Sequence, residues 1–324
     1  MNKHGVVGAA IIAALLSVAT VPAMAQGEAK PLRLVVPFAP GGAGDVVARA
    51  IAPGLSERLQ RPVIVENKPG GSTVVAADYV AKSPPDGNTL LLTTEATLAI
   101  TPALVAKLPY DPVKDFVPVT MVVNMPLVLV AGPKNDISTV EQVVARAKMS
   151  PGELSYASVG GGSPQQLAMV LFNRMSNTSM NHIPYKGGSP AVTDLVGGQV
   201  DFFFAAIGTA APHLASGKIR AIGLTGTQRH PALPQVPTIA EAGLPGYETS
   251  VWLGLLGPAG MPSAQVDRIQ AEVARLVHQP AYKDRWMALG ADAVGNSPAA
   301  FAEIIRKDAE RWGKVIKEAQ IKAD

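Results

Sequence analysis

The chain first passes from a hydrophobic strand into a helix through the stretch Val36-Pro37-Phe38-Ala39-Pro40-Gly41-Gly42-Ala43-Gly44-Asp45. A strand that turns through glycine into an Ala-rich segment with helical spacing is typical of a βα unit. The first helical turn leaves backbone N–H groups without intrahelical partners, and glycine lets an anion approach them closely. The stretch therefore predicts an anion-binding loop, in which Asp45 caps the helix instead of meeting the ligand. A tight βα turn without a ligand remains the alternative.

A second stretch repeats this chemistry further along: Ala157-Ser158-Val159-Gly160-Gly161-Gly162-Ser163-Pro164. It again joins a strand to a helix, so the two loops can face one cleft. A charge-assisted hydrogen bond from an N–H group to a carboxylate contributes on the order of 1.5 to 3 kcal/mol. Four or five such bonds would therefore exceed the roughly 8 kcal/mol of micromolar binding without any arginine. A purely structural turn is again the alternative.

Three further strand ends carry groups suited to a ligand, at residues 93–97, 185–188 and 202–206. The carboxyl edge of a parallel sheet is where such groups meet a ligand. The hydroxyls can instead satisfy nearby backbone, and some of the phenylalanines belong to the core. The residues predicted to bind the ligand are Phe38, Ala39, Pro40, Gly41, Gly42, Ala43, Gly44, Thr94, Glu95, Ser158, Gly160, Gly161, Gly162, Ser163, Tyr185, Phe204 and Ala206.

The alternation of strands and helices predicts an α/β protein with mostly parallel sheets. Strands are expected near residues 33–38, 63–66, 89–93, 127–131, 155–159, 181–185, 200–205, 220–225 and 251–256, with helices between them and two amphipathic helices at the end. Pro53 predicts a kink or a break in the first helix. Without its first 25 residues, which are discussed below, the chain keeps about 300 residues, more than one hydrophobic core usually holds. We therefore expect two domains. Domain 1 would comprise residues 26–124 plus 252–324, and domain 2 residues 125–251.

Residues 1–25 are typical of an export signal peptide. Lys3 precedes an apolar run that ends in Ala23-Met24-Ala25, a pattern that a signal peptidase cleaves. A membrane anchor needs about 20 apolar residues, and this run is shorter. The sequence therefore predicts a periplasmic protein with a cleaved N-terminal signal peptide.

Composition argues against several other classes of protein. A net charge of +3, with no basic stripe, disfavours nucleic acid as a partner. The absence of cysteine excludes disulfides and thiolate metal sites. His182, His213, His230 and His278 show no metal-ligand spacing. We therefore expect no catalytic residue, no metal and no cofactor. We also expect the protein to act as a monomer.

Ordered motifs span nearly the whole mature chain: residues 35–42 (VVPFAPGG), 65–70 (VENKPG), 85–87 (PDG), 108–112 (LPYDP), 182–187 (HIPYKG) and 234–243 (PQVPTIAEAG). Together they resemble the Bug receptors of tripartite tricarboxylate transporters. The resemblance implies a type II periplasmic-binding-protein fold, with two α/β domains joined by two crossing strands around a cleft. The loops at 38–44 and 158–163 would hold a ligand carboxylate there, partly through ordered water. The protein would deliver its ligand to the membrane components of the transporter and would not be an enzyme.

Some positions depart from the usual pattern of that family. Gly44 replaces a usual Thr or Ser, Leu98 and Gln166 replace a frequent His, and Ala205-Ala206 replaces a frequent Asp-Asn. Without an acid at the last pair, binding of an amino-acid ammonium group is disfavoured. We therefore expect a di- or tricarboxylate or an aromatic carboxylate.

A nicotinamide-dependent dehydrogenase is the main alternative. Gly42-Ala43-Gly44 follows a strand, and Glu66 ends the next one, as in a dinucleotide fingerprint. The third glycine position holds Val47, however, and an exported protein meets little dinucleotide. A hydrolase is less consistent still, because Gly162-Ser163-Pro164 is not a nucleophile elbow.

Overall fold

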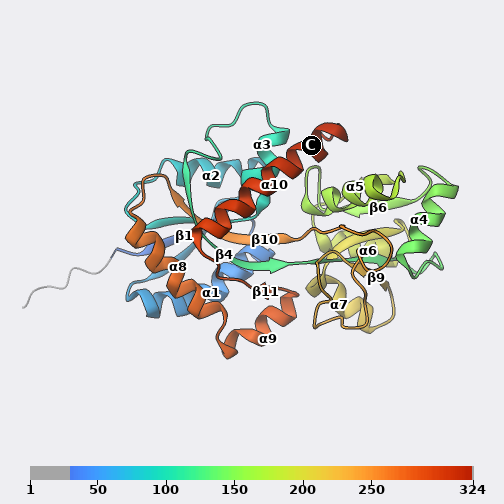
Figure 1. The fold of residues 1–324 in the computed structure, drawn as a ribbon. Helices are drawn as coiled ribbons and strands as arrows, with labels where there is room; N and C mark the ends of the chain where they lie inside the picture. The colour runs from blue at the N-terminus through green and yellow to red at the C-terminus, as the bar shows by residue number, and fades with distance from the viewer. Residues whose placement is uncertain (1–29, 323–324) are drawn as a thin grey trace, which may run out of the picture.

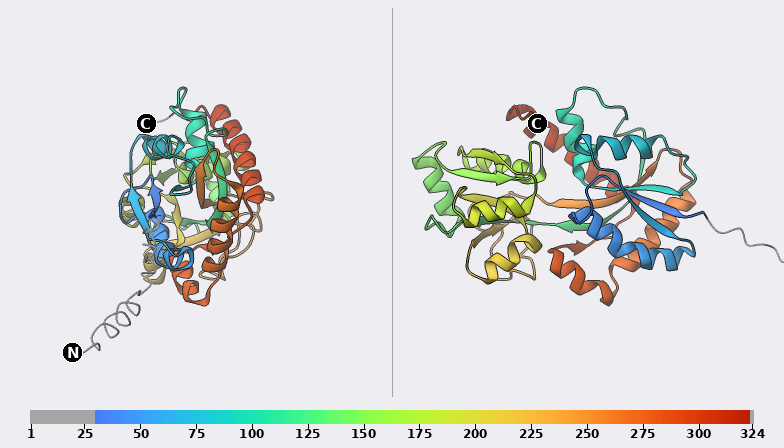
Figure 2. Two further views of the ribbon diagram at one scale, coloured as in Figure 1. Left: turned by 90° about the vertical axis from the view of Figure 1, so that its left-hand side faces the viewer. Right: turned by 180° about the vertical axis from the view of Figure 1, so that it is seen from behind.

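The protein, described by a computed structural model over residues 30–322, consists of two lobes side by side (Figures 1 and 2). The first lobe contains β1 (Leu32–Val36), α1 (Ala43–Leu59), β2 (Val63–Asn67), η1 (Gly71–Thr73), α2 (Val74–Ala81), β3 (Thr89–Thr93), η2 (Ala96–Ile100), α3 (Thr101–Leu104), β4 (Phe116–Met125), β10 (Val251–Pro258), α8 (Ser263–Val277), α9 (Pro280–Leu289), β11 (Asp292–Ala293) and α10 (Pro298–Glu318). The second lobe contains β5 (Leu127–Ala131), α4 (Val140–Met149), β6 (Ser155–Ser158), α5 (Pro164–Ser176), β7 (Asn181–Pro184), α6 (Gly188–Val196), β8 (Phe202–Ala206), α7 (Ile207–Ala215) and β9 (Arg220–Leu224).

Each lobe is built on one mixed sheet. The strand order is β11-β4-β10-β3-β1-β2 in the first lobe and β7-β6-β8-β5-β9 in the second. Strands β1, β2 and β3 are parallel, as are β6, β7 and β8, but β4, β5, β9, β10 and β11 all take part in antiparallel pairs. The expectation of mostly parallel sheets was therefore wrong. The strands that carry the chain out of a lobe and back into it run against their neighbours.

The two lobes are joined by β4 and β10, which pair antiparallel from Val251 opposite Met125 to Pro258 opposite Phe116. The chain passes from β4 into β5 after Met125, and it returns at Val251. The register of the pair shifts between Leu253 and Gly254, and such an irregularity bends a strand. The predicted fold of two α/β units joined by two crossing strands is confirmed.

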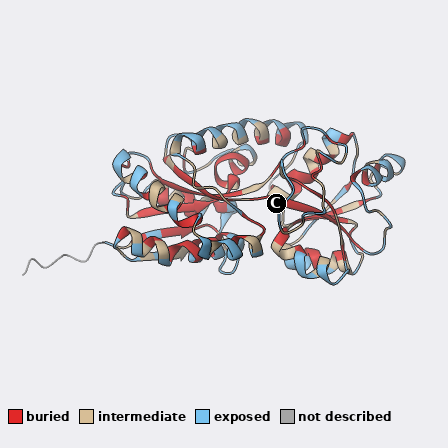
Figure 3. Ribbon diagram, turned by 60° about the horizontal axis from the view of Figure 1, so that its bottom comes forward, coloured by how far each residue is buried: buried red, intermediate tan, exposed pale blue. Residues whose placement is uncertain are grey.

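Helices cover both faces of each sheet, and the central strands such as β3, β5 and β8 are buried, whereas the edge strands β2 and β7 are partly exposed (Figure 3). On β5, Leu127, Leu129 and Ala131 pack into one core, while Val128 and Val130 pack into another on the opposite face. Side chains alternate between the two faces of a strand. A strand buried on both faces therefore reads as the continuous apolar run seen in the sequence.

Helix α10 starts on the first lobe and reaches the second (Figure 1). Its residues Trp312 and Ile316 share an apolar cluster with Ile100 of the first lobe and Leu167 of α5. Arg174 and Glu318 form an ion pair between α5 and the end of α10. The C-terminal helix therefore packs on both lobes beside the crossing strands.

Other expectations concern local structure and the N-terminus. Helix α1 runs unbroken through Pro53, so the predicted break is absent. The predicted signal peptide, residues 1–25, lies outside the described residues.

Within residues 30–322, no helix is both long and apolar enough to cross a membrane. Over the same range, no group of three or more His, Cys, Asp or Glu side chains is arranged to hold a metal ion.

Candidate functional site between the lobes

One cavity of about 710 Å³ lies between the lobes and is lined by both glycine loops. Gly42 comes from the β1–α1 loop of the first lobe, and Gly161 from the β6–α5 loop of the second. The predicted residues that the fold brings together there are Phe38, Ala39, Gly41, Gly42, Ala43, Gly44, Thr94, Gly161, Gly162, Ser163 and Ala206.

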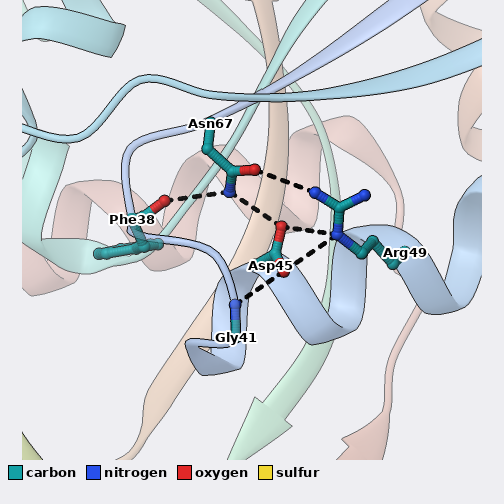
Figure 4. Close-up of polar contacts among 5 residues, drawn as sticks. All are labelled: Phe38, Gly41, Asp45, Arg49 and Asn67. Atoms are coloured by element: carbon teal, nitrogen blue, oxygen red, sulfur yellow. Dashed lines mark hydrogen bonds and ion pairs between the residues drawn. The ribbon is translucent and has the colours of Figure 1, made fainter.

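The β1–α1 loop is fixed from behind by the carboxylate of Asp45 (Figure 4). This group accepts hydrogen bonds from Gly41 N at 2.9 Å, Arg49 Nε at 3.0 Å and Asn67 Nδ2 at 2.9 Å. Asn67 Nδ2 also donates to the Phe38 carbonyl at 3.0 Å. The Arg49 guanidinium and the other donors lower the Asp45 pKa to about 2. The helix begins after Gly42, so Asp45 is not its N-cap as predicted but anchors the loop from inside the first turn.

The β6–α5 loop is held by side chains of its own lobe. Ser163 caps α5 by accepting a hydrogen bond from the Gln166 amide. Gln166 Oε1 accepts from Gly162 N at 2.7 Å, and the Ser158 hydroxyl accepts from Gly160 N at 3.1 Å. His182 Nε2 lies 2.5 Å from Ser158 Oγ. Several loop N–H groups are therefore already bonded, and fewer are available to a ligand than the sequence predicted.

Five helices begin at this cavity. Their N-cap residues, all of which line it, are Gly42 of α1, Thr73 of α2, Ser163 of α5, Gly187 of α6 and Ala206 of α7. A helix start carries partial positive charge and unpaired N–H donors. First-turn residues Ala43, Gly44 and Gln165 also line the cavity. The backbone therefore makes the cavity electropositive.

The side chains of the cavity wall add to this positive potential. Among the residues that the structure describes, Lys186 is the only charged side chain that lines the cavity. Gln165 also lines the cavity. Its side-chain Oε1 atom is buried and has no hydrogen-bond partner within residues 30–322. A buried amide oxygen of this kind favours a donor on a ligand or on water. The cavity thus suits an anion that also carries or recruits a hydrogen-bond donor.

A strained segment, which the sequence did not reveal, forms part of the wall. Residues 70–73 all have positive φ, and the values for Ser72 and Thr73 are 51° and 80°. Such a conformation is rare for a β-branched residue. Thr101 Oγ1 donates to the Ser72 carbonyl at 3.0 Å, and Thr97 Oγ1 donates to Thr73 Oγ1 at 2.9 Å. These threonines hold the strained turn, and with it the start of α2, against the cavity.

The remaining predicted residues do not line the cavity: Pro40, Glu95, Ser158, Gly160, Tyr185 and Phe204. Tyr185 donates its hydroxyl to Asp194 Oδ2 at 2.9 Å. Phe204 stacks on Tyr247 in the core of the second lobe, while its neighbour Phe203 lines the cavity. The choice of Phe204 was wrong by one residue, because successive side chains of β8 point to opposite faces.

The lobes approach closely at one edge of the cavity. A Cβ atom added to Gly162 of the second lobe would lie 2.3 Å from Leu104 Cδ1 of the first. The φ of Gly162 is +72°, a conformation that disfavours other residues. The backbone therefore favours glycine here, and a methyl group at this position would force the Leu104 side chain of the facing lobe to shift.

The sequence of the chain matches one known receptor family over most of its length. The model of the tripartite tricarboxylate transporter family receptor matches residues 47–321. The chain belongs to this receptor family.

Solved and curated relatives agree with the assignment. The chain is 36% identical over 312 residues to BugT of Bordetella pertussis, covering 96% of this chain and 94% of that protein. It superposes on a Rhodopseudomonas palustris protein solved with adipate, with TM-score 0.80 and 34% identity, over 90% of this chain and 98% of that one. For MatC of Rhodopseudomonas palustris with bound malate, the TM-score is 0.76 and the identity 34%, over 88% and 98%.

The resemblance to Bug receptors is thus confirmed, and the fold is that of periplasmic binding proteins. The receptor is a solute-binding protein and not an enzyme. The dehydrogenase alternative has no support from these relatives. Val47, which replaces the third glycine of that fingerprint, is buried in the core of the first lobe.

We predict that Asp45→Asn lowers the free energy of unfolding by about 2 kcal/mol at neutral pH, because charge-assisted bonds to the loop are weakened. The folded-state pKa of about 2 lies below the ordinary value of 3.8. The stabilisation is therefore complete above about pH 4 and is lost as the pH falls towards 2. Denaturant unfolding of both proteins from pH 7 to pH 2.5 measures this, with the exposed Asp267→Asn as the control. An equal difference at all pH values would contradict it.

We predict that Gly162→Ala weakens ligand binding at least tenfold, because the new methyl group meets Leu104 and keeps the lobes apart. Gly217→Ala is the matched control, since Gly217 has a φ of +69° but no heavy atom within 4 Å of an added Cβ. It should lose similar stability and keep its affinity. Leu104→Ala should partly restore binding to the Gly162→Ala protein in calorimetry. Equal affinity losses in the two alanine variants would rule out the interlobe contact.

Proposed function

We propose that the protein captures a small organic carboxylate in the cavity between its lobes and delivers it to the membrane components of a tripartite tricarboxylate transporter. One observation carries the proposal: Gly42 and Gly161, from different lobes, share a cavity whose wall contains no acidic side chain among the described residues. Five helix starts face an anion there. The adipate and malate bound to two relatives belong to this chemical class.

Within that class we propose a dicarboxylate as the preferred ligand. One carboxylate would lie between the two glycine loops, where first-turn amides of α1 and α5 are close. Lys186, beside the start of α6, would face the second carboxylate and balance its charge. The cavity of about 710 Å³ is large enough for a ligand of this size and ordered water. A tricarboxylate or an aromatic carboxylate is the alternative, as Phe38 and Phe203 also line the wall.

The site of action follows from the same proposal. We propose that residues 1–25 direct export and are removed, so that a monomer acts in the periplasm. The family of periplasmic receptors supports this. The predicted domains, 26–124 plus 252–324 and 125–251, would close on the ligand by bending where β4 and β10 cross.

A panel of organic acids tests the proposal on the purified mature protein. We expect adipate, malate or a related dicarboxylate to raise the melting temperature. A ligand at a hundredfold excess over its Kd stabilises the folded state by about 2.7 kcal/mol. Gly42→Val should weaken binding while the protein stays folded, because its added Cβ meets the Ala39 carbonyl at 3.3 Å. Gly313→Ala, with nothing within 4 Å of its new methyl group, is the control. No shift across the panel would refute carboxylate binding.

Lys186→Met tests the assignment of the second carboxylate. Adipate and hexanoate have chains of equal length and differ by one carboxylate. We expect the wild type to bind adipate at least tenfold more tightly than hexanoate, since a charge-assisted contact contributes on the order of 1.5 to 3 kcal/mol. The ratio should fall in Lys186→Met and stay unchanged in Lys148→Met, which alters an exposed lysine on α4. An unchanged ratio in both would remove Lys186 from ligand recognition.

A further inference from the structure

His182 lies beside the glycine loop of the second lobe without lining the cavity. It belongs to β7, the edge strand next to β6, and is half-buried. Its ring stacks on Tyr156, with the ring centroids 5.1 Å apart. Both ring nitrogens lie within hydrogen-bonding distance of Ser158 and Gln166, the side chains that hold the loop. Any effect of His182 on a ligand would therefore pass through these two neighbours.

The orientation of the Gln166 side chain is fixed by the backbone. Gly162 N lies 2.7 Å from Gln166 Oε1. A backbone N–H group can only donate, so this end of the amide must be the acceptor oxygen. The other end, Nε2, lies 3.1 Å from His182 Nδ1. An amide NH2 group donates, so Nδ1 must be the unprotonated nitrogen of the ring.

The proton of the neutral imidazole is therefore on Nε2, which faces Ser158. Ser158 Oγ accepts this hydrogen bond at 2.5 Å and a second one from Gly160 N at 3.1 Å. Its own hydroxyl hydrogen is left to donate to the Gly160 carbonyl, also at 3.1 Å. The bonds form one directed chain, here called the relay: Gly162 N–H, Gln166, His182, Ser158 and the Gly160 carbonyl.

The direction of the relay excludes a catalytic Ser–His pair. A serine nucleophile gives its proton to a histidine, which must present an unprotonated nitrogen. In the relay, the nitrogen of His182 that faces Ser158 carries the proton, and the serine oxygen accepts it in a hydrogen bond. Ser158 is also fully buried and does not line the cavity. The pair therefore serves the loop and not a reaction.

The relay encloses the part of the loop that faces the cavity. Gly160 and Gly162 have positive φ values of 125° and 72°, and both their amides are bonded within the relay. Between them lies Gly161, which lines the cavity together with Gly162 and Ser163. Glycine has more accessible conformations than any other residue. The bonds on either side of Gly161 therefore select the one in which the loop meets the cavity.

We propose that His182 is a positioning residue, which as the neutral Nε2–H tautomer orders the relay and so holds the glycine loop ready for a ligand carboxylate. This inference rests on the proposed function, because the loop is taken to hold the ligand. The members of the relay lie on β6, the loop after it, α5 and β7, all in the second lobe. The relay therefore does not depend on where the first lobe lies, and it can be measured without a ligand.

Nitrogen NMR of the imidazole tests the direction of the relay in the ligand-free protein. At about pH 8, a histidine of ordinary pKa is neutral. The His182 signals, identified by their loss from His182→Phe, should show Nε2 protonated and Nδ1 unprotonated. The carboxylate introduced by Gln166→Glu can only accept, so Nδ1 should become protonated in that variant. A protonated Nδ1 in the wild type, or an unprotonated Nδ1 in Gln166→Glu, would overturn the relay.

Amide hydrogen exchange tests whether the relay transmits order across the loop. Ser158→Ala removes the acceptor of Gly160 N, but Gly162 N bonds to Gln166 at the other end. We expect both amides to exchange at least about fivefold faster in Ser158→Ala, because loss of one bond loosens the next. The matched control is Ser155→Ala on the same strand, where the lost hydroxyl bonds to Asp201. Faster exchange of Gly160 alone would overturn the relay.

Calorimetry with adipate and malate connects the relay to binding. We expect affinity to fall about tenfold in Ser158→Ala and in His182→Phe, which keeps a ring to stack on Tyr156, while Ser155→Ala binds like the wild type. Because both variants break one relay, the double variant should lose little more than the weaker-binding single variant. Losses that multiply in the double variant, or wild-type affinity in both single variants, would overturn the role of His182.

These measurements keep the inference distinct from the proposed function. If carboxylates bind equally well to the wild type and to both single variants, the proposed function stands and the positioning role of His182 fails. If the spectra and exchange rates are as expected but no carboxylate binds the wild type, the proposed ligand class fails while the effect of His182 on the loop stands.

Discussion

Two lobes can share one ligand here because β4 and β10 cross between them as a hydrogen-bonded pair. The pair runs from Val251 opposite Met125 to Pro258 opposite Phe116, so the link is a two-stranded ribbon and not a loose tether. The ribbon joins the two lobes beside the cavity that the β1–α1 and β6–α5 loops share. The properties that need both lobes, such as the shared cavity and the approach of Gly162 to Leu104, depend on that link.

The cavity obtains its charge from backbone more than from side chains. Helix starts supply partial positive charge without the mobility of a lysine or arginine, and they tolerate water between donor and ligand. Acids are kept out of the lining: Asp45 is paired with Arg49 behind one loop, and Glu95 is buried behind another segment. Such a wall suits an anion through its backbone, and the polar side chains Lys186 and Gln165 are left to distinguish one anion from another under the proposed function.

Much of this arrangement could be predicted from local sequence. The two glycine loops, their place at strand ends and the capping role of Ser163 depend on neighbours in the chain, and the structure has all of them. The choice between Phe203 and Phe204 failed because three consecutive phenylalanines give no clue to which face is buried. The strained turn at Ser72 and Thr73 was missed because Thr97 and Thr101, which hold it, are distant in sequence.

The order of residues alone determined which elements form, where anions can meet bare backbone, and which receptor family the chain resembles. The first two depend on hydrophobic period, glycine and helix starts, which act over a few residues, and the resemblance depends on short motifs ordered along the chain. Tertiary structure alone decided which amides remain available, since Gln166 and Ser158 occupy those of Gly162 and Gly160. It also decided that Glu95 lies against Trp252 and does not line the cavity, because the partner of a buried polar group is set by packing between segments far apart in the chain.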